Sequence, residues 1–335
     1  ARAGRYDDAV REWERFLAAH PNDARWQAVR ARIVDAAFAK GEGLRKAGKT
    51  DEAVAAFRAF AAAYPTDARA PNALLAVGGI LRGTQDFEGA IQAWRHVEGR
   101  YATSPAAPEA LWWIAVSLED DLHRLEDAVK GYEALITRHG ASHRATEARA
   151  RLERLKAKHL ELRMERVIGL DETPALRVVT RNIPKLDVHV YRLDMEEYFR
   201  RKGTVLGVEN LQLEVVKPDE TATWSIEGYK PFALFEADRE VPVDKPGAYV
   251  VVAGDEKLTA TALFLVSDVE MVVKKARNHH LFVWAFHRTN QSPVQGARVL
   301  VNEDGVPLVS PQPLTIVAAV VDEQPHKCST CVPFG

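Results

Sequence analysis

The sequence contains few cysteines, no long apolar run and no excess of charge of either sign. Its two cysteines, Cys328 and Cys331, lie among the last eight of 335 residues, so no disulfide framework shapes the fold. No apolar run approaches the ~18 residues that a membrane-spanning helix needs. Lys plus Arg number 45 and Asp plus Glu 47, giving a formal net charge of -2. This balance gives no electrostatic argument for binding nucleic acid or an anionic membrane.

The sequence also lacks an initiator methionine and a signal-peptide pattern. It opens with ARAGRYDDAV, which has the composition of a helix interior. We therefore expect a fragment or a processed product, from which an export signal could have been removed. With 47% hydrophobic residues and a mean hydropathy of -0.24, a chain of this length is predicted to form two or three globular domains.

The composition changes near Gly169. Residues 1 to about 165 are rich in Ala, Arg, Glu and Leu, with apolar residues at helical spacing. From about residue 171 onward, Val, Thr, Tyr and Phe occur in short runs broken by Pro and Gly, a pattern typical of strands. The sequence therefore predicts a multidomain α-then-β fold. We expect a helical-repeat domain at 1–168, an antiparallel β-sandwich at 169–268 and a partial second β-sandwich at 269–335.

One helix pattern occurs four times in the first half. A column of alanines recurs at spacings of 44, 37 and 38 residues, at Ala9, Ala53, Ala90 and Ala128. Four residues after each comes an aromatic side chain, at Trp13, Phe57, Trp94 and Tyr132. A small residue and a bulky one at i+4 lie on one helix face, so a partner helix can pack closely on the alanine. Further helical segments, such as APNALLAVGGILRG and APEALWWIAVSLEDD, lie between these copies.

Helix pairs that repeat every 37 or 38 residues resemble tetratricopeptide repeats. The repeats are similar to those of bacterial envelope-assembly lipoproteins, and the resemblance implies a solenoid that binds proteins. We attribute the longer first spacing of 44 residues to a longer helix around Ala31 to Gly43.

Adjacent tryptophans stand in the third helix pair. Trp112 and Trp113 would point about 100° apart on a helix, so both cannot enter the same core seam. We expect each to face a different neighbouring helix; the alternative is that one lines the concave groove in which such solenoids hold peptides. Trp112, Trp113 and Asn72 are the candidate residues of this protein-binding groove.

The segment GLRKAGKT, Gly43 to Thr50, fits the phosphate-binding pattern G-x-x-x-x-G-K-[ST]. Such a loop needs a buried strand before it and a helix after it, so that backbone donors converge on the phosphates. The preceding residues ARIVDAAFAKGE have a helical pattern instead. We therefore predict no nucleotide site, and expect Lys49 and Thr50 to be turn and cap residues, with Thr50 as the helix N-cap.

The second half contains successive strand-like runs. Alternation is clearest in KLDVHVYRLD, where one face carries Leu186, Val188 and Val190, and the other carries Asp187, His189 and Tyr191. Three segments, KLDVHVYRLDMEEYF, VPVDKPGAYVVVAGDEKLTATALFLVSDVEMVVKK and HHLFVWAFHRTNQSPVQGARVLVNEDG, together resemble the amino-terminal macroglobulin-like domains of bacterial alpha-2-macroglobulins. The resemblance covers residues 171–309, and its motif positions are Pro246, Gly247, Tyr249, Asp268, Pro293, Gly296, Ala297 and Val299.

Members of this family resemble protease traps, in which a bait segment is cut, the molecule rearranges and a C-x-E-Q thioester often captures the protease. The resemblance implies an endopeptidase inhibitor of the bacterial cell envelope, periplasmic or extracellular, of which this chain is scaffold and protein-binding module. In VDEQ, Val321 stands where the thiol is required, so this segment forms no thioester. The alternative is an interaction scaffold in envelope assembly without inhibitory activity. Both hypotheses involve protein partners, no enzyme activity and no cofactor.

The remaining candidates for chemistry have simpler interpretations. Cys328 and Cys331 with His326 give three zinc ligands where a structural site needs four. The acidic runs SLEDD and MEEYF are expected to be solvated faces. No metal site is predicted at HHLFVWAFH, because strand geometry separates His279 from His287 by about 26 Å at ~3.3 Å per residue. Pro293 is expected to stay out of the strand ladder, with Gly296 in the turn.

Overall fold

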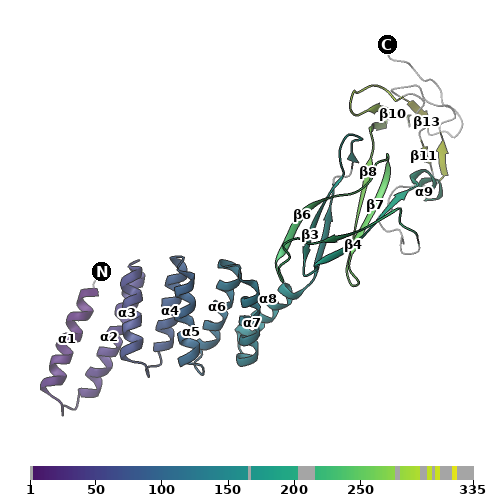
Figure 1. Cartoon of the computed structure of the whole chain (residues 1–335). Coiled ribbons are helices and arrows are strands. Elements are labelled where there is room, and N and C mark those ends of the chain that lie inside the picture. Colours follow the sequence, from purple (N-terminus) through teal and green to yellow (C-terminus); the bar gives the residue numbers. More distant parts are fainter. Residues whose placement is uncertain are drawn as a thin grey trace. The chain divides into compact units, whose positions relative to one another are not determined.

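The computed structural model describes residues 3–164, 167–202, 216–275, 280–294, 300–303, 306–309 and 319–322. The chain divides into two compact units, Ala1–Ala157 and Lys158–Gly335. The first is built of helices and the second mainly of strands (Figure 1). None of the described helices combines the length and the apolarity that a bilayer crossing requires.

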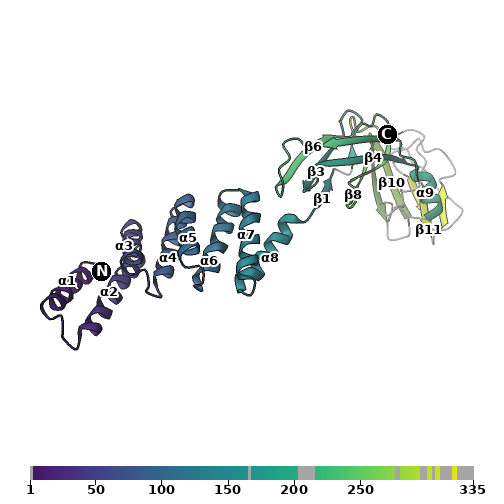
Figure 2. The same ribbon diagram turned by 60° about the horizontal axis from the view of Figure 1, so that its bottom comes forward.

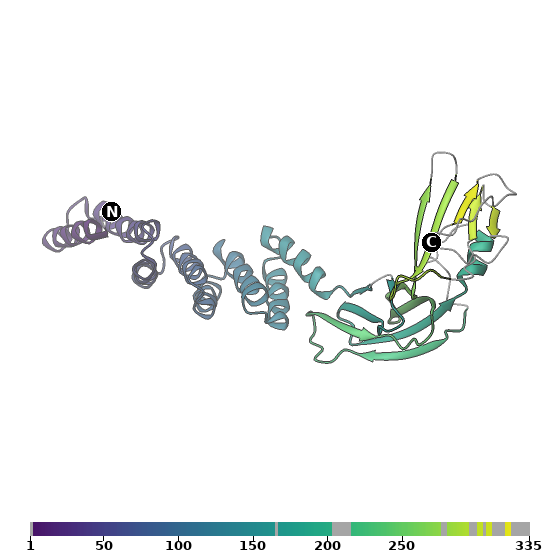
Figure 3. The same cartoon turned by 90° about the horizontal axis from the view of Figure 1, so that it is seen from above.

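Eight α-helices form the first unit as it is described. Their bounds are Ala3–Ala19 (α1), Trp26–Lys46 (α2), Thr50–Ala63 (α3), Ala70–Gly83 (α4), Phe87–Arg100 (α5), Ala106–Val116 (α6), Leu125–His139 (α7) and His143–Lys156 (α8). Each helix packs on the next, and the helices follow one another in chain order (Figures 2 and 3). Helix α2 has 21 residues and α4 has 14, which confirms that a longer helix causes the 44-residue spacing.

The predicted alanine and aromatic columns form the interior of this unit. Ala53, Ala90 and Ala128 are completely buried. The aromatic side chains that follow each of them, Phe57, Trp94 and Tyr132, are also buried. The first copy is less enclosed, because Ala9 and Trp13 in α1 are only half-buried. Packing on one helix face therefore explains the second to fourth members of both columns, as the spacing predicts.

Two glycines in the intervening helices make room for the aromatic column. A Cβ atom added to Gly41 would lie 2.6 Å from the Phe57 ring, and one added to Gly78 would lie 2.1 Å from Trp94 Nε1. Trp94 Nε1 also donates a hydrogen bond to the Leu75 carbonyl at 3.3 Å. Because no other residue lacks a Cβ, glycine is required wherever a large ring approaches the helix backbone this closely.

Ion pairs connect successive repeats of the first unit. The arginine and carboxylate partners are 34 to 39 residues apart in sequence, which is about one repeat: Arg69–Asp35, Arg144–Glu109, Arg124–Glu88 and Arg82–Asp121. Each pair therefore adds a nearest-neighbour contact to the packing of one helix pair on the next.

The change from helix to strand precedes the predicted boundary at residue 168. Helix α8 ends at Lys156, and strand β1 spans His159–Arg163. Strand β1 pairs antiparallel with β3, Ala175–Arg181, and so belongs to the second unit. The segment HLELRMER has helix-favouring residues, but pairing with a neighbouring strand overrides a weak local preference.

Two sheets share the main core of the second unit. One has the strand order β1-β3-β6, and the other has the order β2-β8-β7-β4-β5. Every pairing in these sheets is antiparallel except that of β2 with β8. The further strand bounds are Val167–Ile168 (β2), Lys185–Leu193 (β4), Glu220–Ser225 (β5), Leu234–Glu240 (β6), Gly247–Gly254 (β7) and Thr259–Val266 (β8), and helix α9 spans Met195–Lys202.

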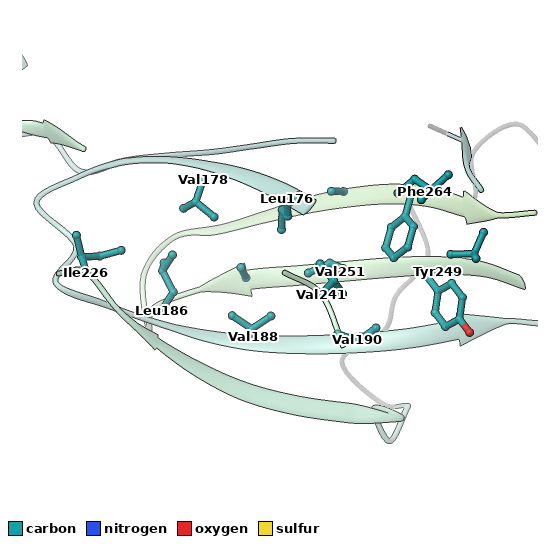
Figure 4. Packing of buried hydrophobic residues seen from close by; sticks show 14 of the residues in the cluster. Leu176, Val178, Leu186, Val188, Val190, Ile226, Val241, Tyr249, Val251 and Phe264 are labelled. Atoms are coloured by element: carbon teal, nitrogen blue, oxygen red, sulfur yellow. The ribbon is translucent and has the colours of Figure 1, made fainter. Parts of the chain in front are cut away.

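A single cluster of buried apolar side chains comes from both sheets (Figure 4). Leu186, Val188 and Val190 belong to it, as the alternation in β4 predicts. Tyr191 on the opposite face of β4 is also buried, at 7% exposure. The rings of Tyr249 and Phe264 stack in the cluster with centroids 5.4 Å apart.

A separate three-stranded sheet follows, with the order β13-β10-β9. Its strands are Val269–Lys275 (β9), His280–His287 (β10) and Ala319–Asp322 (β13), while Leu300–Glu303 (β11) pairs with Val306–Val309 (β12). Residue 269, at which the second β-domain is predicted to begin, is the first residue of β9. His280 and His287 are the two end residues of β10, as expected, and no metal-binding cluster occurs among the described residues.

Pro293 lies outside the strands, as expected, and forms an isolated bridge with Phe286. The flanking Ser292 carbonyl and Val294 N–H make the hydrogen bonds of this bridge. Residues outside the described part of the chain include His279, Gly296, Ala297, Val299, Gln324, His326, Cys328 and Cys331.

Candidate protein-binding groove

The adjacent tryptophans face different neighbours. Trp112 is 7% exposed and its ring lies 5.7 Å from that of Tyr132 in α7. Trp113 is half-buried and stacks on Trp94 of α5, with ring centroids 6.3 Å apart and an interplanar angle of 27°. The two rings therefore pack against different helices, as expected, and both side chains also line hollows at the surface.

Two adjoining hollows lie along helices α4, α6 and α8. The first has a volume of about 580 Å³ and is lined chiefly by apolar and small residues, including Leu75, Gly79, Gly83, Phe87, Trp94 and Trp113. The second, of about 590 Å³, lies between α6 and α8 and is lined by Trp112, Trp113, Val116, Arg144, Ala150 and Arg151, among others. Arg82 and Trp113 line both hollows. We call the combined surface the tryptophan groove.

Three arginines cover the indole rings of the groove. The guanidinium carbon of Arg82 lies 5.2 Å from the centroid of Trp113, and that of Arg144 lies 5.2 Å from Trp112. Arg151 lies over the Trp112 ring at 5.5 Å. A guanidinium within about 6 Å of an aromatic centroid is attracted to the ring face. The arginines and tryptophans therefore form one contiguous stack across α4, α6 and α8.

The same arginines are paired with carboxylates. Arg82 binds Asp121 through two hydrogen bonds of 2.6 and 3.2 Å, and Arg144 Nε lies 2.9 and 3.0 Å from the two carboxylate oxygens of Glu109. The hydrogen bond from Arg82 holds the pKa of Asp121 below its ordinary value. The Arg82–Asp121 pair uses two guanidinium nitrogens, and this two-point geometry fixes the guanidinium plane. The positive charges of the groove are thus neutralised by the protein itself.

The acidic run SLEDD is not a solvated face, contrary to expectation. Residues Ser117–Asp121 form a π-helical turn, η1, in which Glu119 is buried with 6% exposure. Glu119 accepts hydrogen bonds from Tyr132 at 2.7 Å and from Arg151 at 3.0 Å, and it also binds Arg154. Burial and the nearby carboxylate raise the pKa of Tyr132. The buried cluster holds Arg151 beside Trp112.

The second acidic run, MEEYF, forms a solvated face, as predicted. MEEYF lies in α9, which has no buried residue, and Glu196 and Glu197 form ion pairs with the arginines four residues later.

Asn72 lies on the expected helix but outside both hollows. It is an exposed residue in the first turn of α4. Leu75, Gly79 and Arg82 follow it by three, seven and ten residues, so the four share one helix face. Asn72 therefore lies on the same helix face as the α4 residues that line the first hollow, but it lines neither hollow.

The GKT segment has the helical surroundings that exclude a phosphate loop. Helix α2 runs to Lys46 and α3 begins at Thr50. Gly48 has φ of +72°, the left-handed conformation of a tight turn. The expected N-cap at Thr50 is wrong: the N-cap residue is Lys49, with no side-chain capping bond, and its Nζ pairs with Glu52 at 2.7 Å.

Residues 1–37 and 38–97 match the family model of the tetratricopeptide repeat. The first unit carries tetratricopeptide repeats. No curated protein matches the sequence of the chain.

Several solved structures are similar to parts of the chain. One is native alpha-2-macroglobulin from Escherichia coli spanning domains MG0-NIE-MG1, with 18% identity over 49% of this chain and a TM-score of 0.35; the match spans 55% of that structure. A tetratricopeptide repeat protein from Parabacteroides merdae matches over 45% of this chain and 54% of its own, with 16% identity and a TM-score of 0.31. The first TPR of Spaghetti (RPAP3) bound to the HSP90 peptide SRMEEVD matches over 36% of this chain and 90% of its own, with 19% identity and a TM-score of 0.29.

The arginines that line the tryptophan groove are residues that the sequence alone does not single out. Arg82, Arg144 and Arg151 stand among many other charged residues of the helices. Each has a carboxylate partner in another element, between 31 and 39 residues away. The sequence signal that could identify these arginines is a carboxylate about one repeat away from an arginine, together with a nearby tryptophan.

Proposed function

We propose that this chain is a protein-interaction module whose tryptophan groove binds a segment of another polypeptide. The observation that carries the proposal is the aromatic surface formed by Trp112 and Trp113 beside two open hollows. Stacked side chains from three helices give such a surface a fixed shape, and binding loses less entropy on a surface ordered in advance. Tetratricopeptide repeats suggest a scaffold for protein–protein contacts. Helical-repeat units expose extended surfaces of this kind for binding.

Site-specific photo-crosslinking in the full chain tests this proposal. A photoreactive amino acid replaces Ala150, an exposed residue that lines the second hollow. The matched control carries it at Arg95, an exposed residue of α5 that lines neither hollow. We expect the Ala150 position to form a crosslink to one defined protein, identified by mass spectrometry, that the Arg95 position does not form. Equal crosslinking at both positions would contradict a groove-based function.

We further propose that the chain belongs to an alpha-2-macroglobulin-like protein of the bacterial cell envelope, located in the periplasm or outside the cell. In this proposal the second unit contains macroglobulin-like β-sandwiches that act as scaffold in a non-enzymatic protease inhibitor. The main support for this proposal is the macroglobulin-like sequence motif of residues 171–309. Its Tyr249 lies in the core cluster, and the phenol donates a 2.7 Å hydrogen bond to the Lys245 carbonyl just before Pro246. The motif residue Asp268 binds His287 Nδ1 at 2.9 Å and so joins the start of β9 to the end of β10.

The gene that encodes this chain provides the decisive observation. We expect the coding sequence beyond residue 335 to contain further strand-rich domains, a bait segment and, where a thioester is used, C-x-E-Q. The full-length protein should slow the cleavage of a large protein substrate by an endopeptidase. A full-length protein that slows no protease would leave the interaction-scaffold function standing and remove the inhibitory one.

A further inference from the structure

We infer that the tryptophan groove recognises a polypeptide segment through an uncharged, large apolar side chain, aromatic or branched aliphatic, within a stretch of low charge. This inference rests on the proposed function and specifies the chemistry of the bound segment. It depends on two independent features: the open apolar hollow beside Trp113, and the pairing of every arginine that faces the groove.

The hollow beside Trp113 offers space next to apolar surface. A Cβ atom built on Gly79 or Gly83 meets no atom within 4 Å, so these two helix positions border open space. Leu75, Phe87 and the stacked rings of Trp94 and Trp113 form the remaining apolar surface. Its volume of about 580 Å³ lies in the range of ligand pockets. Arg82, Gln85, Glu109 and Asp121 also line it, so the wall combines this apolar surface with polar side chains, of which the three charged ones are paired.

The charges of the groove offer little attraction to a charged side chain. Three lining arginines face four lining carboxylates, Glu109, Asp120, Asp121 and Glu147. Arg82 is bound by Asp121, Arg144 by Glu109 and Glu147, and Arg151 by Glu119 and Asp120. An incoming carboxylate would compete with a carboxylate already bound to each arginine, and an incoming cation would compete with an arginine already bound to the carboxylate that it approaches.

The partial burial of these ion pairs strengthens the discrimination against charged ligand groups. The side chains of Arg82 and Asp121 are only 28% and 17% exposed, and those of Arg144 and Glu109 are 23% and 38% exposed. A partly buried charge that loses its partner is poorly compensated by water. Charged ligand groups are therefore selected against, whereas an apolar side chain can enter beside Trp113 without breaking an ion pair.

A peptide selection on the full chain tests the inference. The probe is a phage-displayed library of random peptides of about twelve residues. We expect selected peptides to share a central Trp, Phe, Leu or Ile, and few charged residues. A synthetic copy of the most enriched peptide should bind with an affinity that changes less than about twofold between roughly 50 and 500 mM NaCl, because long-range charge attraction is screened by salt.

A matched pair of glycine variants locates the binding site. Gly79→Leu places a side chain in the open space of the first hollow and should weaken the selected peptide at least about tenfold, the effect of filling a ligand site. Gly99→Leu in α5 also meets no atom within 4 Å, lies outside both hollows and should leave binding unchanged. Circular dichroism of both variants checks that the helices remain folded.

The outcomes separate this inference from the function on which it rests. Selection of acidic or basic peptides whose affinity falls steeply with salt, yet is lost in Gly79→Leu, would overturn the inference and keep the groove as a binding site. Peptides that bind Gly79→Leu and the unchanged chain equally well would overturn both.

Discussion

Gly78 shows how closely one residue can determine the packing of a helix pair. The space in which its Cβ would lie is occupied by Trp94 Nε1, at 2.1 Å. Gly78→Ala should therefore destabilise the first unit by about 1–3 kcal/mol, the usual effect of overpacking a core. Chemical denaturation followed by circular dichroism measures this change. The control is Gly79→Ala, which meets no atom and should be neutral or stabilise the helix by up to about 1 kcal/mol. Equal destabilisation by both variants would refute the packing argument.

Glu119 is a second residue whose surroundings determine its role. Its side chain is 7% exposed and binds Arg151 and Arg154, while its neighbour Asp120 is 41% exposed. Glu119→Gln should lower the free energy of unfolding by about 3 kcal/mol, because two cations lose a buried partner. Asp120→Asn changes a carboxylate that is itself 41% exposed and so should cost less than about 1 kcal/mol. A Glu119→Gln protein as stable as the Asp120→Asn protein in denaturant titrations would show that the buried cluster is unimportant.

Among the elements, η1 explains why one repeat spacing is 38 residues and not 37. Gly41 and Gly78 each precede the next alanine of the column by 12 residues, whereas the corresponding Ala115 precedes Ala128 by 13. The π-helical turn Ser117–Asp121 lies in this interval, and its i→i+5 hydrogen bonds enclose one more residue than an α-helical turn. The extra residue accounts for the repeat spacing of 38 in place of 37 and places Glu119 in the interior.

Carboxylates that accept hydrogen bonds from arginines make the stability of the first unit depend on pH in a defined way. Hydrogen bonds from arginines lower the pKa values of Asp67, Asp121 and Glu147 from the ordinary 3.8, 3.8 and 4.5. A carboxyl group whose pKa is lower in the folded state stabilises the fold above its ordinary pKa, and this contribution is lost as pH falls through the lowered value. The melting temperature of the helices should therefore be constant from pH 7 to about pH 5 and fall below about pH 4. In Arg82→Gln the acid-induced decrease should be smaller, since Asp121 then titrates near its ordinary value. An unchanged decrease would contradict the assignment.

Most helices and strands follow from sequence periodicity, because alternation and helical spacing report directly on burial. The β4 alternation and the alanine column are examples. Three features could not be predicted because they depend on distant partners. Strand β1 owes its conformation to pairing with β3, η1 is one inserted residue inside a helical pattern, and Arg144 is placed by Glu109 and two tryptophans. Trp112 and Trp113 could be identified as groove candidates since large aromatic residues are uncommon next to each other.

The whole chain has two units with separate cores. We therefore expect two unfolding transitions, one for Ala1–Ala157 and one for Lys158–Gly335. Gly78→Ala should shift only the helical transition. Leu176→Ala, which removes a fully buried side chain from the sheet core, should shift only the other, by about 2–5 kcal/mol. Differential scanning calorimetry together with circular dichroism at helix-sensitive wavelengths resolves the two events. A single transition displaced equally by either substitution would show that the units unfold together.

The widened turn at η1 also has a consequence for how repeats can vary. The additional residue places the side chain of Glu119 in the interior, while Ala115 and Ala128 both remain fully buried. One repeat can therefore differ from its neighbours by a single residue without losing the buried alanines on which its helices pack. An alignment that penalises such insertions heavily would place the acidic run of this repeat opposite the wrong residues and hide the feature that organises the groove.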